Sequence, residues 1–220
     1  MDELKFAEAR ARMVREQLQA RHIQDVRVLD AMLRVPRHRF VAFEQLPHAY
    51  EDHALPIGLE QTISQPFMVA TMLEMAHLTG KERVLDVGAG SGYQAALLAE
   101  LTQTVLTIER HAELAEHARA TLQELGYQNV TVVVGDGSLG YPEGAPYDRI
   151  FVAAASPRTP ESLIAQLAPN GRLIIPVGTT EPQTLTLITK DASGQTFIHE
   201  HGGCGFVPLI GAEGWPDPEK

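Results

Sequence analysis

The sequence VLDVGAGSGYQAALLAEL occupies residues 84–101 and gives the clearest indication of the fold. A short apolar run ends at Val87, glycines follow at positions 88, 90 and 92, and a run of helix-forming residues begins at once. Glycine adopts the left-handed backbone of a tight strand-to-helix turn, and its lack of a side chain lets a ligand approach the N-terminus of the helix. The stretch therefore predicts a strand, a ligand-binding loop and a helix of an α/β sheet.

The chain beyond this stretch continues the alternation of helices and short apolar strands. We expect helices at 67–78, 92–101, 112–125 and 160–167, and strands at 83–87, 104–108, 130–134, 149–152 and 172–176. Runs at 184–189 and 195–201 alternate around an Asp-Ala-Ser-Gly turn and predict an antiparallel hairpin. The predicted fold class is therefore α/β: a doubly wound, mostly parallel, Rossmann-like sheet with N-terminal helices and a C-terminal antiparallel hairpin.

The first 66 residues follow a different pattern. Apolar residues at helical spacing predict a helix over 3–20, and a second helix begins at about Asp25 and ends before Pro36. Residues 37–66 read as an irregular loop, and a loop of that length in a compact domain is usually functional. We therefore expect a cap at 1–66 that carries substrate-side residues and a cofactor-binding core with its hairpin and tail at 67–220, joined in one compact unit.

Composition and charge exclude several classes of protein. The 220 residues carry a formal charge of −10, with +2 over residues 1–50 and −12 over the remainder, which disfavours binding to phosphate backbones. No apolar run approaches the length of a membrane span, and the N-terminus is charged throughout. Cys204 is the single cysteine, so no internal disulfide forms. We expect a cytoplasmic monomer with no nucleic-acid or membrane partner.

The glycine loop carries an acidic residue that argues against a dinucleotide. Its pattern is G-x-G-x-G, with Asp86 two residues before Gly88, whereas the dinucleotide fingerprint is G-x-G-x-x-G. A pyrophosphate would be repelled by Asp86, but the sulfonium and amino groups of S-adenosylmethionine would be attracted. Glu109 ends the next strand, where a carboxylate accepts hydrogen bonds from ribose hydroxyls, and Asp136-Gly137 follows the third strand. The predicted cofactor residues are Asp86, Gly88, Ala89, Gly90, Gly92, Glu109, Asp136 and Gly137.

Several further motifs resemble those of a known family. They are VPR at 35–37, RFV at 39–41, AYED at 49–52, LPIG at 55–58, QTISQP at 61–66, VVVGDGSLGYP at 132–142, APYDRIFVAAA at 145–155, LAPNGRLIIPVG at 167–178 and FVPL at 206–209. Together with the glycine loop, which resembles the cofactor loop of class I methyltransferases, they resemble the protein-L-isoaspartate O-methyltransferases. The resemblance extends from about residue 10 to residue 210.

The resemblance implies a reaction and a set of site residues. These enzymes transfer a methyl group from S-adenosylmethionine to the free carboxylate of isoaspartyl residues in damaged proteins, giving S-adenosylhomocysteine and an ester that collapses to a succinimide. The family's active-site serine corresponds to Ser64, with Thr62 beside it. The resemblance assigns substrate binding to Pro56, Ile57, Gln65, Val207, Pro208 and Leu209. A carboxylate is already nucleophilic at neutral pH, so we expect alignment and exclusion of water rather than a general base.

Other interpretations remain open from the sequence. His199, His201 and Cys204 lie close together, but no neighbouring residue completes a tetrahedral metal site, so we expect no metal. The same cofactor fold could act on a small carboxylate or on nucleic acid. A protein that binds the cofactor without catalysis is a third possibility, which cofactor binding without turnover would reveal.

Overall fold

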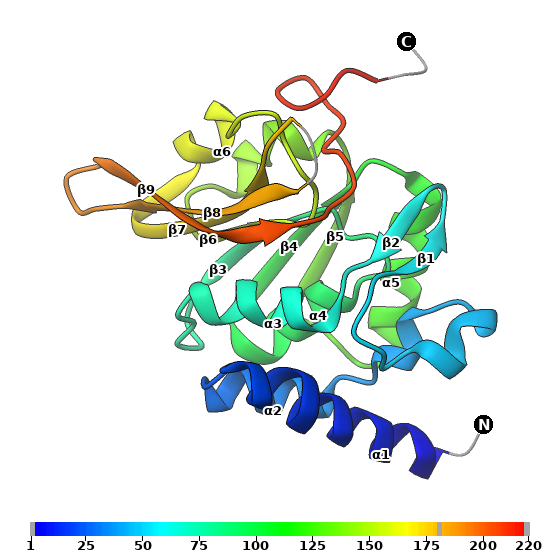
Figure 1. Cartoon of the computed structure of the whole chain (residues 1–220). Helices are drawn as coiled ribbons and strands as arrows, with labels where there is room; N and C mark the ends of the chain where they lie inside the picture. The colour runs from blue at the N-terminus through cyan, green and yellow to red at the C-terminus, as the bar shows by residue number, and fades with distance from the viewer. Residues whose placement is uncertain (1–2, 180–181, 218–220) are drawn as a thin grey trace.

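The computed structural model describes residues 3–179 and 182–217. Seven strands form one sheet in the order β5-β4-β3-β6-β7-β8-β9, and β1 and β2 form a separate hairpin (Figure 1). The strands are β1 Leu55–Gly58, β2 Gln61–Ile63, β3 Arg83–Val87, β4 Thr104–Glu109, β5 Val130–Val134, β6 Tyr147–Val152, β7 Leu167–Val177, β8 Gln183–Lys190 and β9 Thr196–Cys204. The α-helices are α1 Glu3–Met13, α2 Val26–Arg34, α3 Pro66–Met75, α4 Tyr93–Leu101, α5 Ala112–Glu124 and α6 Glu161–Ala165.

The predicted doubly wound, mostly parallel sheet is confirmed. Strand β3 is the middle one of the five parallel strands and pairs with β4 and β6, while β8 and β9 complete the sheet in antiparallel fashion beside β7. Two separate clusters of buried apolar residues pack on its two faces, because successive side chains of a strand point to opposite sides. Val84 belongs to the cluster on the α4 side, whereas Leu85 and Val87 belong to the other.

Of the two helices predicted in the first 35 residues, the first ends differently from the prediction and the second agrees with it. The helix expected over 3–20 is α-helical only to Met13, and continues as a π-helical turn at Val14–Leu18 and a 3-10 turn at Gln19–Arg21. The second helix follows the prediction closely: the Asp25 side chain caps it by accepting from the N–H groups of Arg27 and Val28.

The 37–66 segment is more regular than the predicted loop. It contains two 3-10 helices, Arg37–Phe40 and Phe43–His48, and the antiparallel β1–β2 hairpin. The hairpin turn places Leu59 and Glu60 at positive φ, a conformation that side-chain-bearing residues adopt rarely and that the sequence does not reveal. The strands of this hairpin are only four and three residues long, too short for a distinct alternation pattern.

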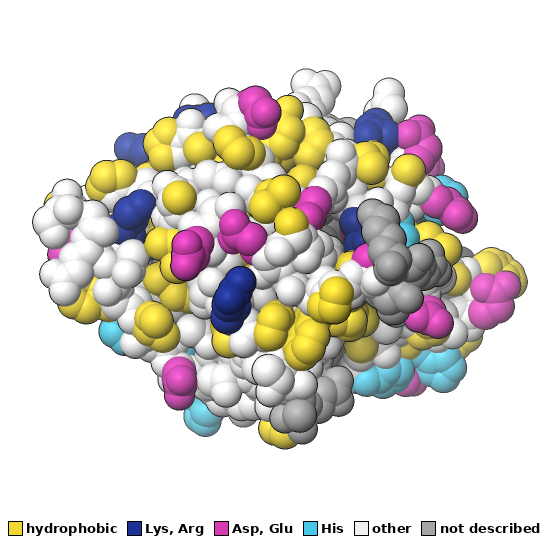
Figure 2. All heavy atoms as spheres, turned by 90° about the horizontal axis from the view of Figure 1, so that it is seen from above, with side chains coloured by type: hydrophobic (Ala, Val, Ile, Leu, Met, Phe, Trp, Pro, Cys, Tyr) yellow, Lys and Arg dark blue, Asp and Glu magenta, His cyan; other side chains and the backbone are white. Residues whose placement is uncertain are grey.

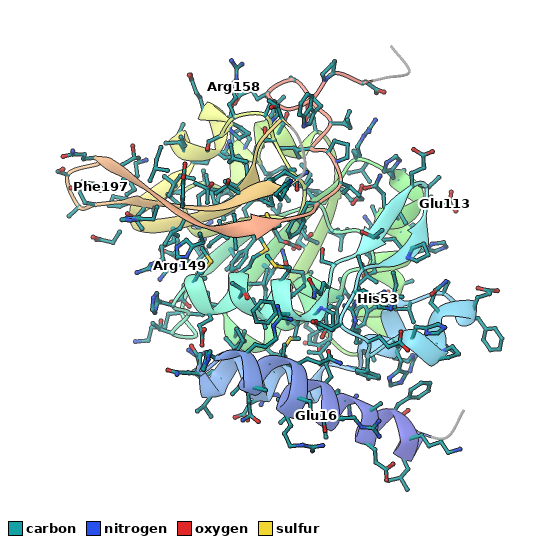
Figure 3. The ribbon with its side chains drawn as sticks, in the orientation of Figure 1. Glu16, His53, Glu113, Arg149, Arg158 and Phe197 are labelled. Atoms are coloured by element: carbon teal, nitrogen blue, oxygen red, sulfur yellow. The ribbon has the colours of Figure 1, made fainter. Side chains whose placement is uncertain are left out.

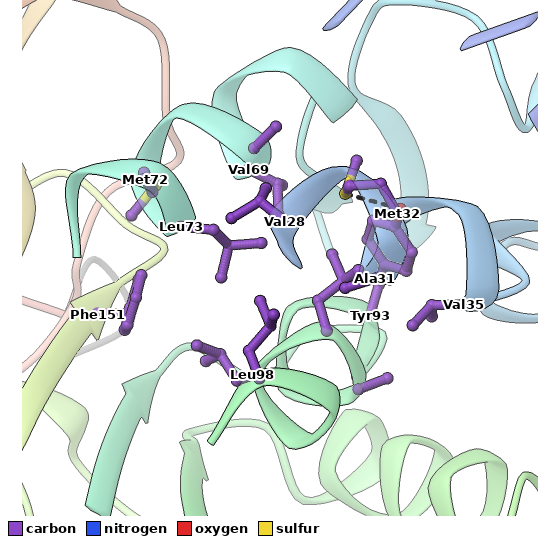
Figure 4. Packing of buried hydrophobic residues seen from close by; sticks show 14 of the residues in the cluster. Val28, Ala31, Met32, Val35, Val69, Met72, Leu73, Tyr93, Leu98 and Phe151 are labelled. Carbon is purple, nitrogen blue, oxygen red and sulfur yellow. Dashed lines mark hydrogen bonds between the residues drawn. The ribbon is translucent and has the colours of Figure 1, made fainter. Parts of the chain in front are cut away.

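One apolar cluster joins the N-terminal elements to the sheet. Figure 4 shows Met32 of α2 against Tyr93 of α4, with Val69 and Leu73 of α3 nearby. The Tyr93 hydroxyl donates to the Met32 sulfur at 3.7 Å, and the cluster continues through Phe151 of the sheet. In Figure 1, α1 and α2 accordingly lie outside α3 and α4, on the side away from the sheet. Burial of this shared apolar surface is what fixes the cap relative to the core.

Within residues 3–179 and 182–217, no helix is both long enough and apolar enough to span a bilayer.

Candidate active site

The glycine loop turns sharply at the carboxyl end of β3. Gly88 and Gly90 both have positive φ, at 93° and 50°. The N–H groups of Gly88 and Ala89 donate to the Ile108 carbonyl at 2.8 and 3.2 Å, so the loop is fastened to the end of β4. These contacts place the loop at the carboxyl edge of a parallel sheet, where ligands of such folds bind.

Glu109 faces the same loop from the end of β4. Its side chain is only 5% exposed, and its Oε2 accepts from the Gly90 N–H at 2.9 Å. Its Oε1 accepts from the His111 N–H at 3.0 Å. The carboxylate is therefore held in one orientation at the bottom of the loop. A fixed carboxylate of this kind is suited to accept hydrogen bonds from the hydroxyl groups of a ligand.

A concave site, which we call the inner cavity, lies between this loop and two distant segments. One segment is β2 with the residue that follows it, and the other is the tail after β9. The sequence-predicted residues that line the inner cavity are Thr62, Ser64, Gly88, Ala89, Gly90, Glu109, Gly137, Val207, Pro208 and Leu209. Residues from five places in the sequence are thus brought together at one edge of the sheet.

A second concavity, the outer groove, adjoins the inner cavity. It runs between the segment around Asp52 and α3 on one side and the segment after β9 on the other, and Gln65 lines it. Thr62, Ser64, Ala153 and Val207 line both concavities. The hydroxyls of Thr62 and Ser64 therefore stand where the two spaces meet.

The alternation of strand β2 explains how these hydroxyls are presented. Ile63 is 4% exposed and belongs to the apolar cluster shared with α3. Thr62 and Ser64 flank it and so point to the opposite side, away from that cluster. Pairing of Thr62 with Pro56 of β1 fixes the position of the strand.

Comparison with known proteins decides the family. A family model described as protein-L-isoaspartate(D-aspartate) O-methyltransferase matches residues 8–214. The chain belongs to this family. It is accordingly an S-adenosylmethionine-dependent methyltransferase that acts on isoaspartyl residues.

Individual relatives agree over nearly the whole chain. Protein-L-isoaspartate O-methyltransferase 2 of Geotalea uraniireducens is 54% identical over 207 residues, which cover 94% of this chain and 95% of that protein. The protein-L-isoaspartate O-methyltransferase of Methanopyrus kandleri is 50% identical over 223 residues, covering 100% and 99%. A similar solved structure, described as a protein-L-isoaspartate O-methyltransferase from Plasmodium falciparum in complex with S-adenosyl-L-homocysteine, has 27% identity and a TM-score of 0.78. The match covers 90% of this chain and 96% of that one. A protein-L-isoaspartate O-methyltransferase structure with 30% identity gives a TM-score of 0.84 over 93% of this chain and 67% of that one.

Asp86 does not line the inner cavity of this methyltransferase. Its side chain is fully buried on the α4 face of the sheet, where Oδ1 accepts from Gln94 Nε2 and Oδ2 from Thr107 Oγ1, both at 2.8 Å. Burial raises its pKa to about 6, although both hydrogen bonds act in the opposite direction. The strand alternation that puts Val84 on this face puts Asp86 there as well. Its direct contact with the cofactor therefore stays a prediction, while its observed contacts connect β3, β4 and α4.

Other predicted residues also lie outside the inner cavity. A Cβ on Gly92 would meet the Ala118 side chain at 3.2 Å, so this glycine allows α4 to pack closely on α5. Asp136 faces the C-terminal tail: its Oδ2 accepts from the Ala212 N–H at 2.8 Å and its Oδ1 from the Ser138 hydroxyl at 2.6 Å. Ile57 lies behind the loop, with its Cδ1 3.3 Å from the position of a Cβ on Gly90. Pro56 is exposed on β1.

Several residues of the two concavities were not among the site residues assigned from the sequence. The inner cavity also contains Gln61, Tyr93, Arg110 and Ile210, and the outer groove contains Arg21, Asp52, Phe67 and Phe206. Arg21 could not be found from spacing, because it precedes Ser64 by more than 40 residues and the 3-10 turn that presents it carries no motif.

The histidines and cysteine near the end of the chain have ordinary environments. His199 and His201 are exposed on β9, whereas Cys204 is 7% exposed and its thiol donates to the Gln183 carbonyl at 3.5 Å. Burial raises the pKa of this thiol to about 11, so the unreactive thiol form dominates at neutral pH. Across residues 3–179 and 182–217, no three His, Cys, Asp or Glu side chains are grouped as metal ligands would be.

Proposed function

We propose that methyl transfer takes place where the inner cavity meets the outer groove, with Ser64 and Thr62 orienting the isoaspartyl carboxylate. The observation that supports this most directly is that both hydroxyl-bearing residues line both concavities. A methyl group passes between two bound molecules only where their sites touch. The inner cavity then holds the cofactor, and the outer groove receives the damaged peptide.

The residues of the inner cavity fit S-adenosylmethionine. The loop has no side chains at Gly88 and Gly90, and Glu109 supplies a fixed carboxylate. A Cβ on Gly137 would lie 2.5 Å from Val87, so the space beside β3 depends on a glycine at this position. When bound, the cofactor supplies an electrophilic methyl group on a cationic sulfur. We propose that Glu109 holds the ribose hydroxyls and that Gly88 to Gly90 line the path of the amino-acid portion.

The acceptor needs positioning rather than activation. A carboxylate is ionised at neutral pH, so the hydroxyls of Ser64 and Thr62 donate hydrogen bonds to it and set its direction. They do so without the strong ion pair that would lower its nucleophilicity. Val207 and Ala153 supply apolar walls at the junction, which exclude competing water. Alignment of this kind accounts for up to roughly 7–11 kcal/mol of barrier reduction in well-oriented reactions.

The reaction is tested with two peptides that differ only in isoaspartate or aspartate at one position. Methylation from labelled S-adenosylmethionine that appears only on the isoaspartyl peptide, and is lost in base, is the expected result. Methylation of neither peptide with the cofactor still bound would support the alternative of a binding protein without catalysis. Methylation of both would contradict the assignment of the acceptor.

The role of Ser64 is tested separately with Ser64→Ala. We expect kcat on the isoaspartyl peptide to fall about ten- to a hundredfold, because loss of one hydrogen bond misaligns the carboxylate. Affinity for S-adenosylhomocysteine, measured by calorimetry, should change much less. Ser193→Ala, in the turn between β8 and β9, is the matched control. Equal losses of rate and cofactor affinity would contradict the assignment.

The remaining expectations about partners are part of this proposal. A formal charge of −10 supports an enzyme that does not bind nucleic acid. The monomeric state and the cytoplasmic location stay predictions from the sequence, which light scattering and cell fractionation would test.

A further inference from the structure

One wall of the outer groove carries a guanidinium group that the reaction itself does not use. The Arg21 guanidinium carbon lies 3.3 Å from the centroid of the Phe67 ring, and its Nη1 donates to Asp52 Oδ2 at 2.6 Å. The Asp52 carbonyl accepts from Gln65 Nε2 at 2.9 Å. Ring, carboxylate and amide thus fix Arg21 on the same wall as Gln65, one residue from Ser64.

Asp52 does not cancel the positive charge of this wall. Arg37 lies behind it, fully buried, and donates through Nε to the Ala49 carbonyl at 2.9 Å. Burial lowers the pKa of Arg37 to about 10, which still leaves it cationic at neutral pH, and Asp52 acts in the opposite direction. Asp52 thus interacts with two guanidinium groups, with Arg21 through a hydrogen bond and with Arg37 only through space, which leaves an excess of positive charge beside the groove.

His53 adds to this excess as the pH falls. It lines the groove beside the β1–β2 hairpin (Figure 3), and the Ala54 carbonyl and the Glu51 carboxylate raise its pKa. Glu51 itself is paired with His48 and His53, at 3.0 and 2.9 Å. Glu51, the carboxylate next to Asp52 in the sequence, is thus already paired with histidines.

Among the described residues, the opposite wall carries no charged side chain. It consists of Pro182 and the segment Gly203 to Val207, in which the bare backbone of two glycines is available to a peptide main chain. Elsewhere the protein is acidic overall, and Figure 2 shows acidic and basic side chains scattered among apolar ones on the face seen from above. A groove with positive excess on one wall is therefore a local departure from the charge of the molecule.

We propose that Arg21 is a specificity-determining residue that favours isoaspartyl segments with an acidic side chain next to the damaged residue and disfavours those with a basic one. The inference rests on the proposed function, since it assumes that the peptide lies in the outer groove. When the isoaspartyl carboxylate of a bound peptide reaches Ser64, the side chain of an adjacent residue of that peptide lies close to Arg21. Among the described contacts of Arg21, only Nη1 is hydrogen-bonded, and its side chain is 44% exposed. Its second amino group is therefore available to an acidic side chain of the substrate.

The experiment measures kcat/KM for peptides that carry Glu, Gln or Lys immediately before or after the same isoaspartate. Wild-type protein should prefer the Glu peptide over the Lys peptide by about fivefold at one of the two positions, because partly exposed ion pairs are modest in strength. The preference should shrink as salt is raised. Arg21→Gln should bring the ratio close to one, and Arg21→Lys should retain part of it because the charge remains.

A matched control separates charge recognition from general effects. Arg34→Gln removes another partly exposed arginine, which pairs with Glu100 at 2.8 Å and does not line the groove, and it should leave the Glu-to-Lys ratio unchanged. Using the ratio cancels any loss of activity common to both peptides. A wild-type ratio near one at both positions, or an unchanged ratio in Arg21→Gln, would overturn the proposal. Failure of the proposed function would look different, since wild-type protein would then not methylate the Gln peptide at all.

Discussion

Replacing Asp86 by asparagine should stabilise the protein relative to wild type, and this gain in the free energy of unfolding should be larger at neutral pH than at acidic pH. The carboxyl group is fully buried, and burial raises its pKa from the ordinary 3.8 to about 6. A shift of roughly two units corresponds to about 3 kcal/mol of differential stability between its two protonation states. Full burial means that solvent does not screen this energy.

The direction follows from comparing the folded and unfolded chains. Below about pH 3.8 the carboxyl group is protonated in both states, so its burial carries no charge penalty. Above about pH 6 it is ionised in both states, and the folded protein bears the whole penalty. Wild-type stability therefore declines, from this group alone, as the pH rises between these values. Asparagine does not titrate, so Asp86→Asn should gain about 3 kcal/mol over wild type across the same interval.

Urea unfolding of both proteins at several pH values between about 4 and about 8 measures the free energy of unfolding of each. Subtracting the wild-type value from that of Asp86→Asn at each pH removes the contribution of titrating groups common to both proteins. Asp30→Asn, at an exposed position of α2, controls for the chemical change itself. Loss of one hydrogen bond to Gln94 or Thr107 would shift the whole curve by a constant amount, without changing its slope. A stability difference that is independent of pH would refute the reasoning.

Two further variants test the cofactor site. Gly137→Ala places a Cβ 2.5 Å from the buried Val87 side chain, so we expect thermal or urea unfolding to show a loss of about 1–3 kcal/mol in stability. Gly202→Ala is the control and should be nearly neutral, because nothing lies within 4 Å of its Cβ position. Equal effects of the two substitutions would contradict the packing argument. Glu109→Gln removes the charge that accepts from the Gly90 N–H, and we expect binding of S-adenosylhomocysteine to weaken about tenfold by calorimetry. Unchanged affinity would argue against a ribose-binding role.

The order of strands and helices in the core could be predicted because local signals and burial agree there. The strand at Arg83–Val87 and the helix capped by Asp25 were predicted closely, since both depend on residues adjacent in sequence. The hairpin at Leu55–Gly58 and Gln61–Ile63 was missed. Its strands are short, and its register depends on packing of Leu55 and Ile63 against helices predicted separately.

The candidate site could be predicted only in part, and the reason differs between its two halves. The conformation of a glycine loop depends on consecutive residues, so Gly88 and Gly90 could be predicted at the cavity. Glu109 could be predicted there because it ends the next strand of the same sheet. Asp86 was predicted at the cofactor because its charge would attract a sulfonium and an amino group, and that contact stays a prediction. The two-residue period of the strand directs its side chain beneath the loop toward Gln94, which charge and spacing alone do not reveal. Arg21 could be found only from the fold, which brings it beside Phe67.

On the proposed assignment of Thr62 and Ser64, in and directly after β2, catalysis depends on the apolar cluster that joins cap and core. An isolated two-stranded hairpin is only marginally stable in water. Here Leu55 and Ile63 are 2% and 4% exposed and belong to the same cluster as Val69 and Leu73 of α3. The hydroxyls of Thr62 and Ser64 are thus positioned by buried apolar side chains of the hairpin and of α3. Because methyl transfer without a general base depends on alignment, a cavity behind Ile63 should lower the transfer rate even where the chain still folds and binds its cofactor.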